Sequence, residues 1–76
     1  MYVVIAKYPV KYSEEYESKI SESVRDNDLS GTCWKKGLRD MTWYVDTESK
    51  ARLYCTKISK LELYELTVDY SFSSEN

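Results

Sequence analysis

The hydrophobic and polar pattern of the chain begins with a strand and a helix. Residues 2–8 are apolar at both odd and even positions and end at Pro9, which is typical of an inner strand that is covered on both faces. Ser13 then provides an N-cap for a helix over residues 13–25. The apolar stripe of this helix recurs every four residues, at Tyr12, Tyr16, Ile20 and Val24. The turn-forming residues 26–31 end the helix.

The second part of the chain predicts a hairpin, a helix and a final strand. Residues 32–36 and 40–45 form the arms of an antiparallel hairpin. In the second arm, one face carries Met41, Trp43 and Val45. Asp46 or Thr47 caps a second helix. The apolar positions of that helix follow the helical period: Ala51, Tyr54, Cys55, Ile58 and Leu61. Residues 64–72 then alternate between apolar and polar, which predicts an edge strand with one solvent-exposed face.

Strand, helix, strand, strand, helix, strand is the element order of the ferredoxin-like, or split βαβ, fold. We therefore expect one α+β domain over residues 1–72, with a four-stranded antiparallel sheet and both helices on one of its faces. Residues 73–76 are expected to form a flexible tail. Seventy-six residues leave room for one hydrophobic core. Since both helices cover the same side of the sheet, we expect the function on the opposite side.

Composition favours a globular intracellular protein. The chain is 42% hydrophobic and 32% charged, with a formal net charge of −2, which is a balance found in folded domains. No apolar run approaches the roughly 20 residues that cross a bilayer, and the first residues lack the features of a secretory signal. We therefore expect a cytoplasmic protein without a membrane partner. Cys33 and Cys55 are expected to be buried, reduced thiols, and the sequence leaves open whether they meet.

The residue types exclude several classes of chemistry. The chain has no histidine, the side chain that most often transfers protons near neutral pH, so Ser-His-Asp and Cys-His nucleophilic systems are excluded. The isolated Gly31 and Gly37 cannot form a phosphate-binding loop. We therefore predict a protein without enzymatic activity and without a cofactor.

One segment partly matches a metal site. Asp26, Asp28 and Ser30 stand at the alternate positions from which a calcium loop offers its oxygen ligands. The twelfth position of such a loop, where a bidentate glutamate is needed, is Gly37 instead. We interpret the segment as a helix-ending turn and keep these three residues as the metal candidate that the sequence offers.

Nucleic-acid binding is one of two functions that the sequence leaves open. Basic and aromatic residues interleave on the predicted hairpin, as single-stranded nucleic acid requires: Trp34, Lys35, Lys36, Arg39 and Trp43. Residues 2–6, Tyr-Val-Val-Ile-Ala, resemble the first RNA-contact strand of RNA-recognition motifs. Residues 41–45 lack the basic-Gly-aromatic-Gly opening of that family's longer motif, so the resemblance assigns no individual base-stacking residue.

Protein recognition is the function that we rank first. Eight Tyr and two Trp stand against one Phe, and Tyr, Trp and Arg are the residues that dominate protein interfaces. The tyrosines that we expect on the sheet face away from the helices are Tyr2, Tyr8, Tyr44, Tyr64 and Tyr70. We predict a small protein-binding module that acts stoichiometrically. One example of such a module is a viral or phage accessory protein that inhibits or modulates a host machine in defence or transcription. In that case the protein would be located in the host cytoplasm. A homodimer through two sheet faces is one arrangement, and addition of the strand ending at Phe72 to a target's sheet is another.

Overall fold

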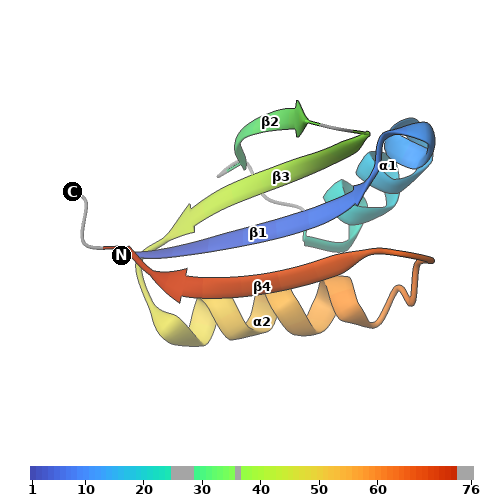
Figure 1. Ribbon diagram of the computed structural model, residues 1–76. Coiled ribbons are helices and arrows are strands. Elements are labelled where there is room, and N and C mark those ends of the chain that lie inside the picture. The colour runs from blue at the N-terminus through green and yellow to red at the C-terminus, as the bar shows by residue number, and fades with distance from the viewer. Residues whose placement is uncertain (25–28, 36, 74–76) are drawn as a thin grey trace.

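The computed structural model describes residues 1–24, 29–35 and 37–73, and for residues 29–35 the backbone alone. The chain forms four strands, two α-helices and one short 3₁₀ helix (Figure 1). The strands are β1 (Tyr2–Pro9), β2 (Leu29–Lys35), β3 (Leu38–Val45) and β4 (Thr67–Phe72). The helices are η1 (Val10–Tyr12), α1 (Ser13–Val24) and α2 (Glu48–Ser59). The strand order across the sheet is β2-β3-β1-β4, and all neighbours are antiparallel.

The sheet that supports the described core is three-stranded, and this corrects the predicted fold class. β1 lies between β3 and β4, whereas β2 pairs with β3 alone, at the outer edge. The register of β2 shifts between Leu29 and Gly31, and a glycine inside a strand often marks such a bulge. In place of the expected four-stranded ferredoxin-like sheet, the packed body is an α+β arrangement of three antiparallel strands and two helices. The structure describes β2 only as a backbone strand added to it.

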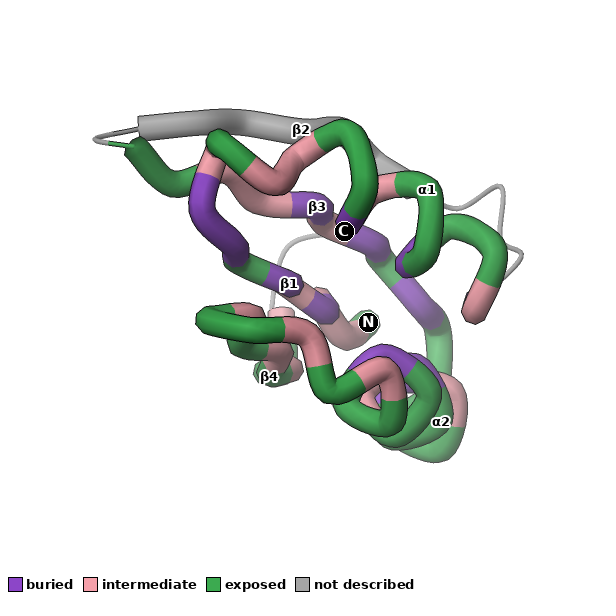
Figure 2. Tube along the Cα trace, turned by 90° about the vertical axis from the view of Figure 1, so that its right-hand side faces the viewer, coloured by how far each residue is buried: buried purple, intermediate pink, exposed green. Residues whose placement is uncertain are grey.

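A single core lies between this sheet and the helices. The strands contribute alternate residues, all of them buried: Val4, Ala6, Tyr8, Met41, Trp43 and Val45. The helices contribute Tyr16, Ile20, Val24, Ala51, Tyr54 and Ile58. Because every second strand residue meets the inward stripes of both helices, α1 and α2 cover the same face of the sheet (Figures 1 and 2). Among the described elements, no helix covers the other face.

The bounds of the strands differ from the predicted ones, and β3 begins at Leu38, two residues before the predicted start. β4 begins at Thr67 rather than at residue 64, because Glu62 and Glu65 adopt positive φ angles of 49° and 58° and turn the chain before it. The turn also contains a backbone hydrogen bond, in which Leu66 N–H donates to Leu63 O at 3.2 Å. β2 begins at Leu29, inside the segment that was predicted as a turn.

α2 begins at a side-chain cap, as the sequence predicts for this position. Thr47 has an extended backbone, and its hydroxyl oxygen accepts a hydrogen bond from the Lys50 N–H at 3.2 Å. This contact satisfies one of the N–H groups that the first helical turn leaves without a partner. The cap fixes the turn from β3 into α2, and α2 then runs beneath β4 (Figure 1).

Candidate functional site

The candidate site is the face of the sheet opposite the helices. Its side chains come from alternate positions of β3, β1 and β4, and in this register Val3 lies between Tyr44 and Ser71. Val3 is half-buried, and Tyr44 is 42% exposed. We call this surface the open face and define it by the following residues: Val3, Ile5, Lys7, Asp40, Thr42, Tyr44, Thr67, Asp69 and Ser71.

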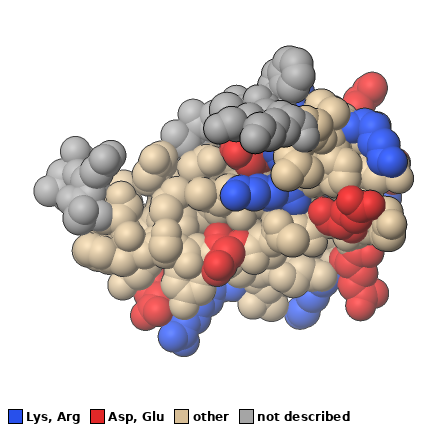
Figure 3. All heavy atoms as spheres, viewed as in Figure 1, with Lys and Arg blue, Asp and Glu red and all other residues tan. Residues whose placement is uncertain are grey.

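The charges of the open face are mixed in sign, with one basic residue, Lys7, and two acidic residues, Asp40 and Asp69. Lys7 lies opposite Asp40 in the β1–β3 register, and Asp69 lies opposite Ile5 in the β1–β4 register. Figure 3 looks onto this side of the molecule and shows scattered acidic and basic groups among mostly uncharged atoms. A phosphate backbone binds through several cationic side chains, and the described part of this face does not group them. The described part of the open face therefore lacks the grouped cations that a phosphate backbone needs.

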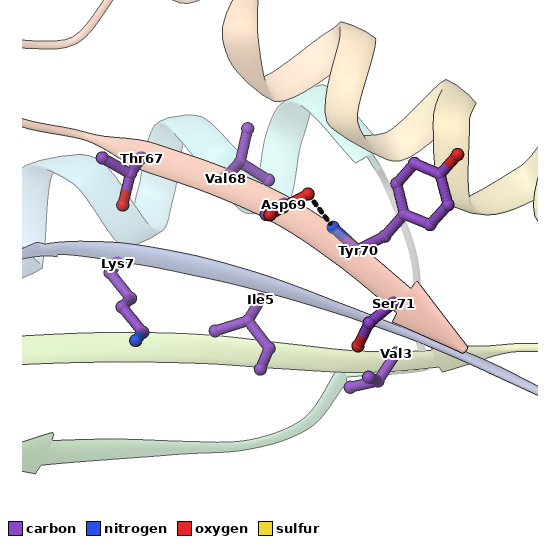
Figure 4. Close-up of a pocket in the computed structure, with 8 residues that line it drawn as sticks. All are labelled: Val3, Ile5, Lys7, Thr67, Val68, Asp69, Tyr70 and Ser71. Carbon is purple, nitrogen blue, oxygen red and sulfur yellow. Dashed lines mark hydrogen bonds between the residues drawn. The ribbon is translucent and has the colours of Figure 1, made fainter. Parts of the chain in front are cut away.

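A hollow of about 450 Å³ lies along β1 and β4 (Figure 4). On the open face, β4 presents only short side chains, and these leave Val3 and Ile5 half-exposed beside them. In Figure 4, Val3, Ile5 and Lys7 project to one side of the sheet, whereas Val68 and Tyr70 project toward α2. The open-face part of the hollow thus has apolar β1 side chains at its base and hydroxyl and charged groups at its rim.

The predicted hairpin residues that the structure describes with side chains are not brought together on this face. Tyr44 is on it, but Trp43 points to the other side of the sheet, is 1% exposed and packs edge-on against Tyr54 at a ring-centroid distance of 6.1 Å. The Arg39 Nε lies 2.6 Å from a carboxylate oxygen of Glu17, on the helix side. The side chains of Trp34 and Lys35, in β2, and all of Lys36 lie outside the described residues.

The other predicted tyrosines lie elsewhere, and Tyr8 is buried in the core. Tyr2 is half-buried on the helix side, with its ring centroid 6.3 Å from that of Tyr70. The Tyr70 hydroxyl donates to a Glu48 carboxylate oxygen at 3.1 Å and accepts from the Arg52 Nε at 3.2 Å. Tyr64 is 68% exposed and precedes β4 in a turn. Sequence reasoning did not include Val3 and Ile5 among the site residues. The signal for them was present, since apolar residues at both odd and even positions of β1 imply that both faces of the strand are covered.

A partly buried polar cluster ties β1, α1 and β3 together. The Tyr8 hydroxyl is fully buried and donates to the Glu17 carboxylate at 2.6 Å, and the same oxygen meets Arg39. Burial, and then the hydrogen bond to Glu17, raises the pKa of Tyr8 far above its ordinary value. The three residues are far apart in the sequence, so no spacing indicates the cluster. The one available signal was a tyrosine at an inward strand position, since a buried hydroxyl needs a partner.

The raised pKa of Tyr8 predicts a loss of stability at alkaline pH. The unfolded chain releases the phenol proton near pH 10, whereas the folded chain retains it, so this contribution to stability is fully present below about pH 10 and is lost as the pH rises further. Urea unfolding at a series of pH values measures the effect. Tyr8→Phe is expected to flatten the alkaline decline. An equally steep decline in that variant would show that Tyr8 is not the group responsible.

Metal-binding and thiol groups give no site within the described chain. In residues 1–24, 29–35 and 37–73, no group of three or more His, Cys, Asp or Glu side chains comes together as a metal site. Asp26 and Asp28 lie outside the described residues, as do the side chains of Ser30 and Cys33. Cys55 is a free, half-buried thiol, and burial raises its pKa.

Comparison with known proteins yields no match to a family model, to a curated protein or to a solved structure. Within the part of the chain that the structure describes, no helix has the length and apolar character needed to span a membrane. The function is therefore inferred from the geometry of the open face.

Proposed function

We propose that this chain is a small, non-catalytic protein-binding module whose open face receives an amphipathic helix of a partner protein. The observation that carries the proposal is the two-sided apolar character of β1. Val4 and Ala6 are covered by the helices, while Val3 and Ile5 on the other side are equally apolar but only half-buried. Strands with this pattern are typical of sheets that are covered on both faces, and here a partner supplies the second layer.

The dimensions of the open face fit one helix. Neighbouring strands lie about 4.8 Å apart, so the strip from β3 across β1 to β4 is about 10 Å wide, close to the diameter of a helix. The eight residues of β1, at about 3.3 Å each, extend for about 26 Å, or roughly four to five helical turns. A strip of this size is smaller than the interfaces of stable complexes, which suits a weak and reversible modulator.

The chemistry of the face specifies the partner helix. Val3, Ile5 and Tyr44 form its apolar centre, so the partner presents apolar residues at positions i, i+3 or i+4, and i+7. The scarcity of basic groups on the described part of the open face favours such a helix over nucleic acid. Two of the residues on which the nucleic-acid alternative depends are engaged elsewhere, Trp43 in the core and Arg39 with Glu17.

Tyr44→Glu is expected to weaken partner binding without unfolding the domain. The substitution places a carboxylate in the apolar centre of the interface, and we expect at least about a tenfold loss of affinity, equivalent to about 1.4 kcal/mol. Quantitative capture from a cell extract by the purified wild-type and variant chains measures the loss. The retained protein should be stoichiometric with the wild-type chain and should stay bound as ionic strength rises.

Leu53→Glu is the matched control, because Leu53 is 49% exposed, similar to Tyr44, but lies on α2. It is expected to leave binding intact. Equal retention by the Tyr44→Glu chain, or equal loss with Leu53→Glu, would contradict the open face as the binding surface. Capture of a nucleic acid that dissociates as salt rises would support the alternative function instead.

A further inference from the structure

β4 is an edge strand, and half of its backbone groups point away from the sheet. The Ser73 N–H donates to Met1 O at 2.8 Å, one position beyond the Tyr2–Phe72 pair. Hydrogen-bonded and non-hydrogen-bonded pairs alternate in an antiparallel ladder, so the pairs at Thr67, Asp69 and Ser71 also bond to β1. The residues between them direct their N–H and C=O groups outward: Val68, Tyr70 and Phe72.

Among these outward N–H groups, the middle one, that of Tyr70, donates a hydrogen bond to a side chain of the same strand. The Tyr70 N–H donates to the Asp69 carboxylate at 2.8 Å, as Figure 4 shows. This contact independently places the Tyr70 N–H on the outer side of β4. The carboxylate takes the place that the carbonyl oxygen of an added strand would need. The middle of the β4 edge is therefore not available for hydrogen bonding to a further strand.

Without this contact, the edge of β4 is complementary to itself. A two-fold axis at Tyr70 pairs Tyr70 with its own copy and Val68 with Phe72, so that residues with outward backbone groups face one another. Phe72 is 66% exposed and would gain a cross-strand apolar neighbour. In this pairing, Asp69 of one copy would lie opposite Ser71 of the other. The facing residue is therefore not a cation that could form an ion pair with the displaced carboxylate.

We infer that the Asp69 side chain is an edge cap that prevents β4 from pairing with β4 of a second copy of this chain. Exposed edge strands are templates for such pairing, and proteins block them with charged side chains. The cap acts at the edge of the sheet and does not depend on what binds the open face.

Asp69→Ala is expected to dimerise the protein at concentrations where the wild-type chain is monomeric, with at least about a tenfold gain in self-affinity. Analytical ultracentrifugation measures the association. In dilute solution, where both chains are monomeric, the Tyr70 amide hydrogen should exchange faster in the variant, because its acceptor is gone. A monomeric Asp69→Ala chain with unchanged Tyr70 exchange would overturn the inference, and so would β4-mediated dimerisation of the wild-type chain.

Two further variants separate the cap from other causes. Asp69→Asn removes the charge but keeps an oxygen that accepts from the Tyr70 N–H, so it is expected to remain monomeric. Dimerisation of this variant as strong as that of Asp69→Ala would identify charge repulsion, and not the cap, as the cause. Adding Phe72→Pro to Asp69→Ala removes an outward N–H at an edge position that accepts proline, and should restore the monomer. Continued association would place the contact elsewhere and refute the assignment.

Discussion

Trp43→Ala is expected to unfold most of the protein at room temperature. Trp43 is 1% exposed, lies on the helix side of β3 and packs edge-on against Tyr54 of α2. Truncation of a buried tryptophan costs about 3–5 kcal/mol through lost burial and the cavity that it leaves. A single core in a domain of this size supplies only about 3–5 kcal/mol of stability, so the loss is comparable to the total. Circular dichroism and urea unfolding measure the outcome.

Tyr44→Ala is the matched control, because Tyr44 is the next residue of the same strand and points to the opposite face. At 42% exposure, its truncation is expected to cost about 1 kcal/mol or less. The contrast also tests where Trp43 belongs. A folded, fully stable Trp43→Ala chain would place the indole on the surface, where the nucleic-acid hypothesis needs it.

Glu17→Ala is expected to lower the free energy of unfolding by about 2–3 kcal/mol. The substitution leaves the fully buried Tyr8 hydroxyl without its acceptor, and such an unsatisfied group costs about 1–3 kcal/mol. It also removes the carboxylate beside Arg39, whose side chain is 29% exposed, so that the ion pair contributes a smaller share. Urea unfolding at neutral pH measures the change.

Removal of the other partner should be milder. Tyr8→Phe deletes the hydroxyl itself and leaves Glu17, whose side chain is 26% exposed, accessible to water. We expect a loss of about 1 kcal/mol, typical of a single hydrogen bond. Glu14→Ala, on the exposed first turn of α1, controls for loss of a carboxylate from the same helix. A loss with Glu14→Ala equal to that with Glu17→Ala would show that the Tyr8 contact contributes little.

The local pattern of the sequence predicts the helices and the inward strand residues well. The four-residue period over residues 13–25 matches α1, which ends at Val24, and the alternation of Met41, Trp43 and Val45 matches three buried positions. The binding hypothesis nevertheless placed Trp43 on the surface. Local composition says which residues share a face of a strand, but it does not say which face the helices cover.

Features that depend on long-range geometry were not predictable from local patterns. Alternation continues through residues 64–66, but Glu62 and Glu65 adopt positive φ angles that their residue type does not signal. The order of elements does not show which strands support the core. The prediction therefore counted one strand too many in the sheet that supports it. The hollow on the open face depends on the β1–β4 register, which brings short side chains beside Val3 and Ile5.

The most direct test of the open face as a binding surface is methyl NMR of the captured complex. With the chain labelled at Val, Ile and Leu methyl groups, we expect intermolecular nuclear Overhauser contacts from the partner to Val3 and Ile5, and none to Leu53 on α2. Contacts to Leu53, with the Val3 and Ile5 signals unchanged on binding, would contradict the proposal.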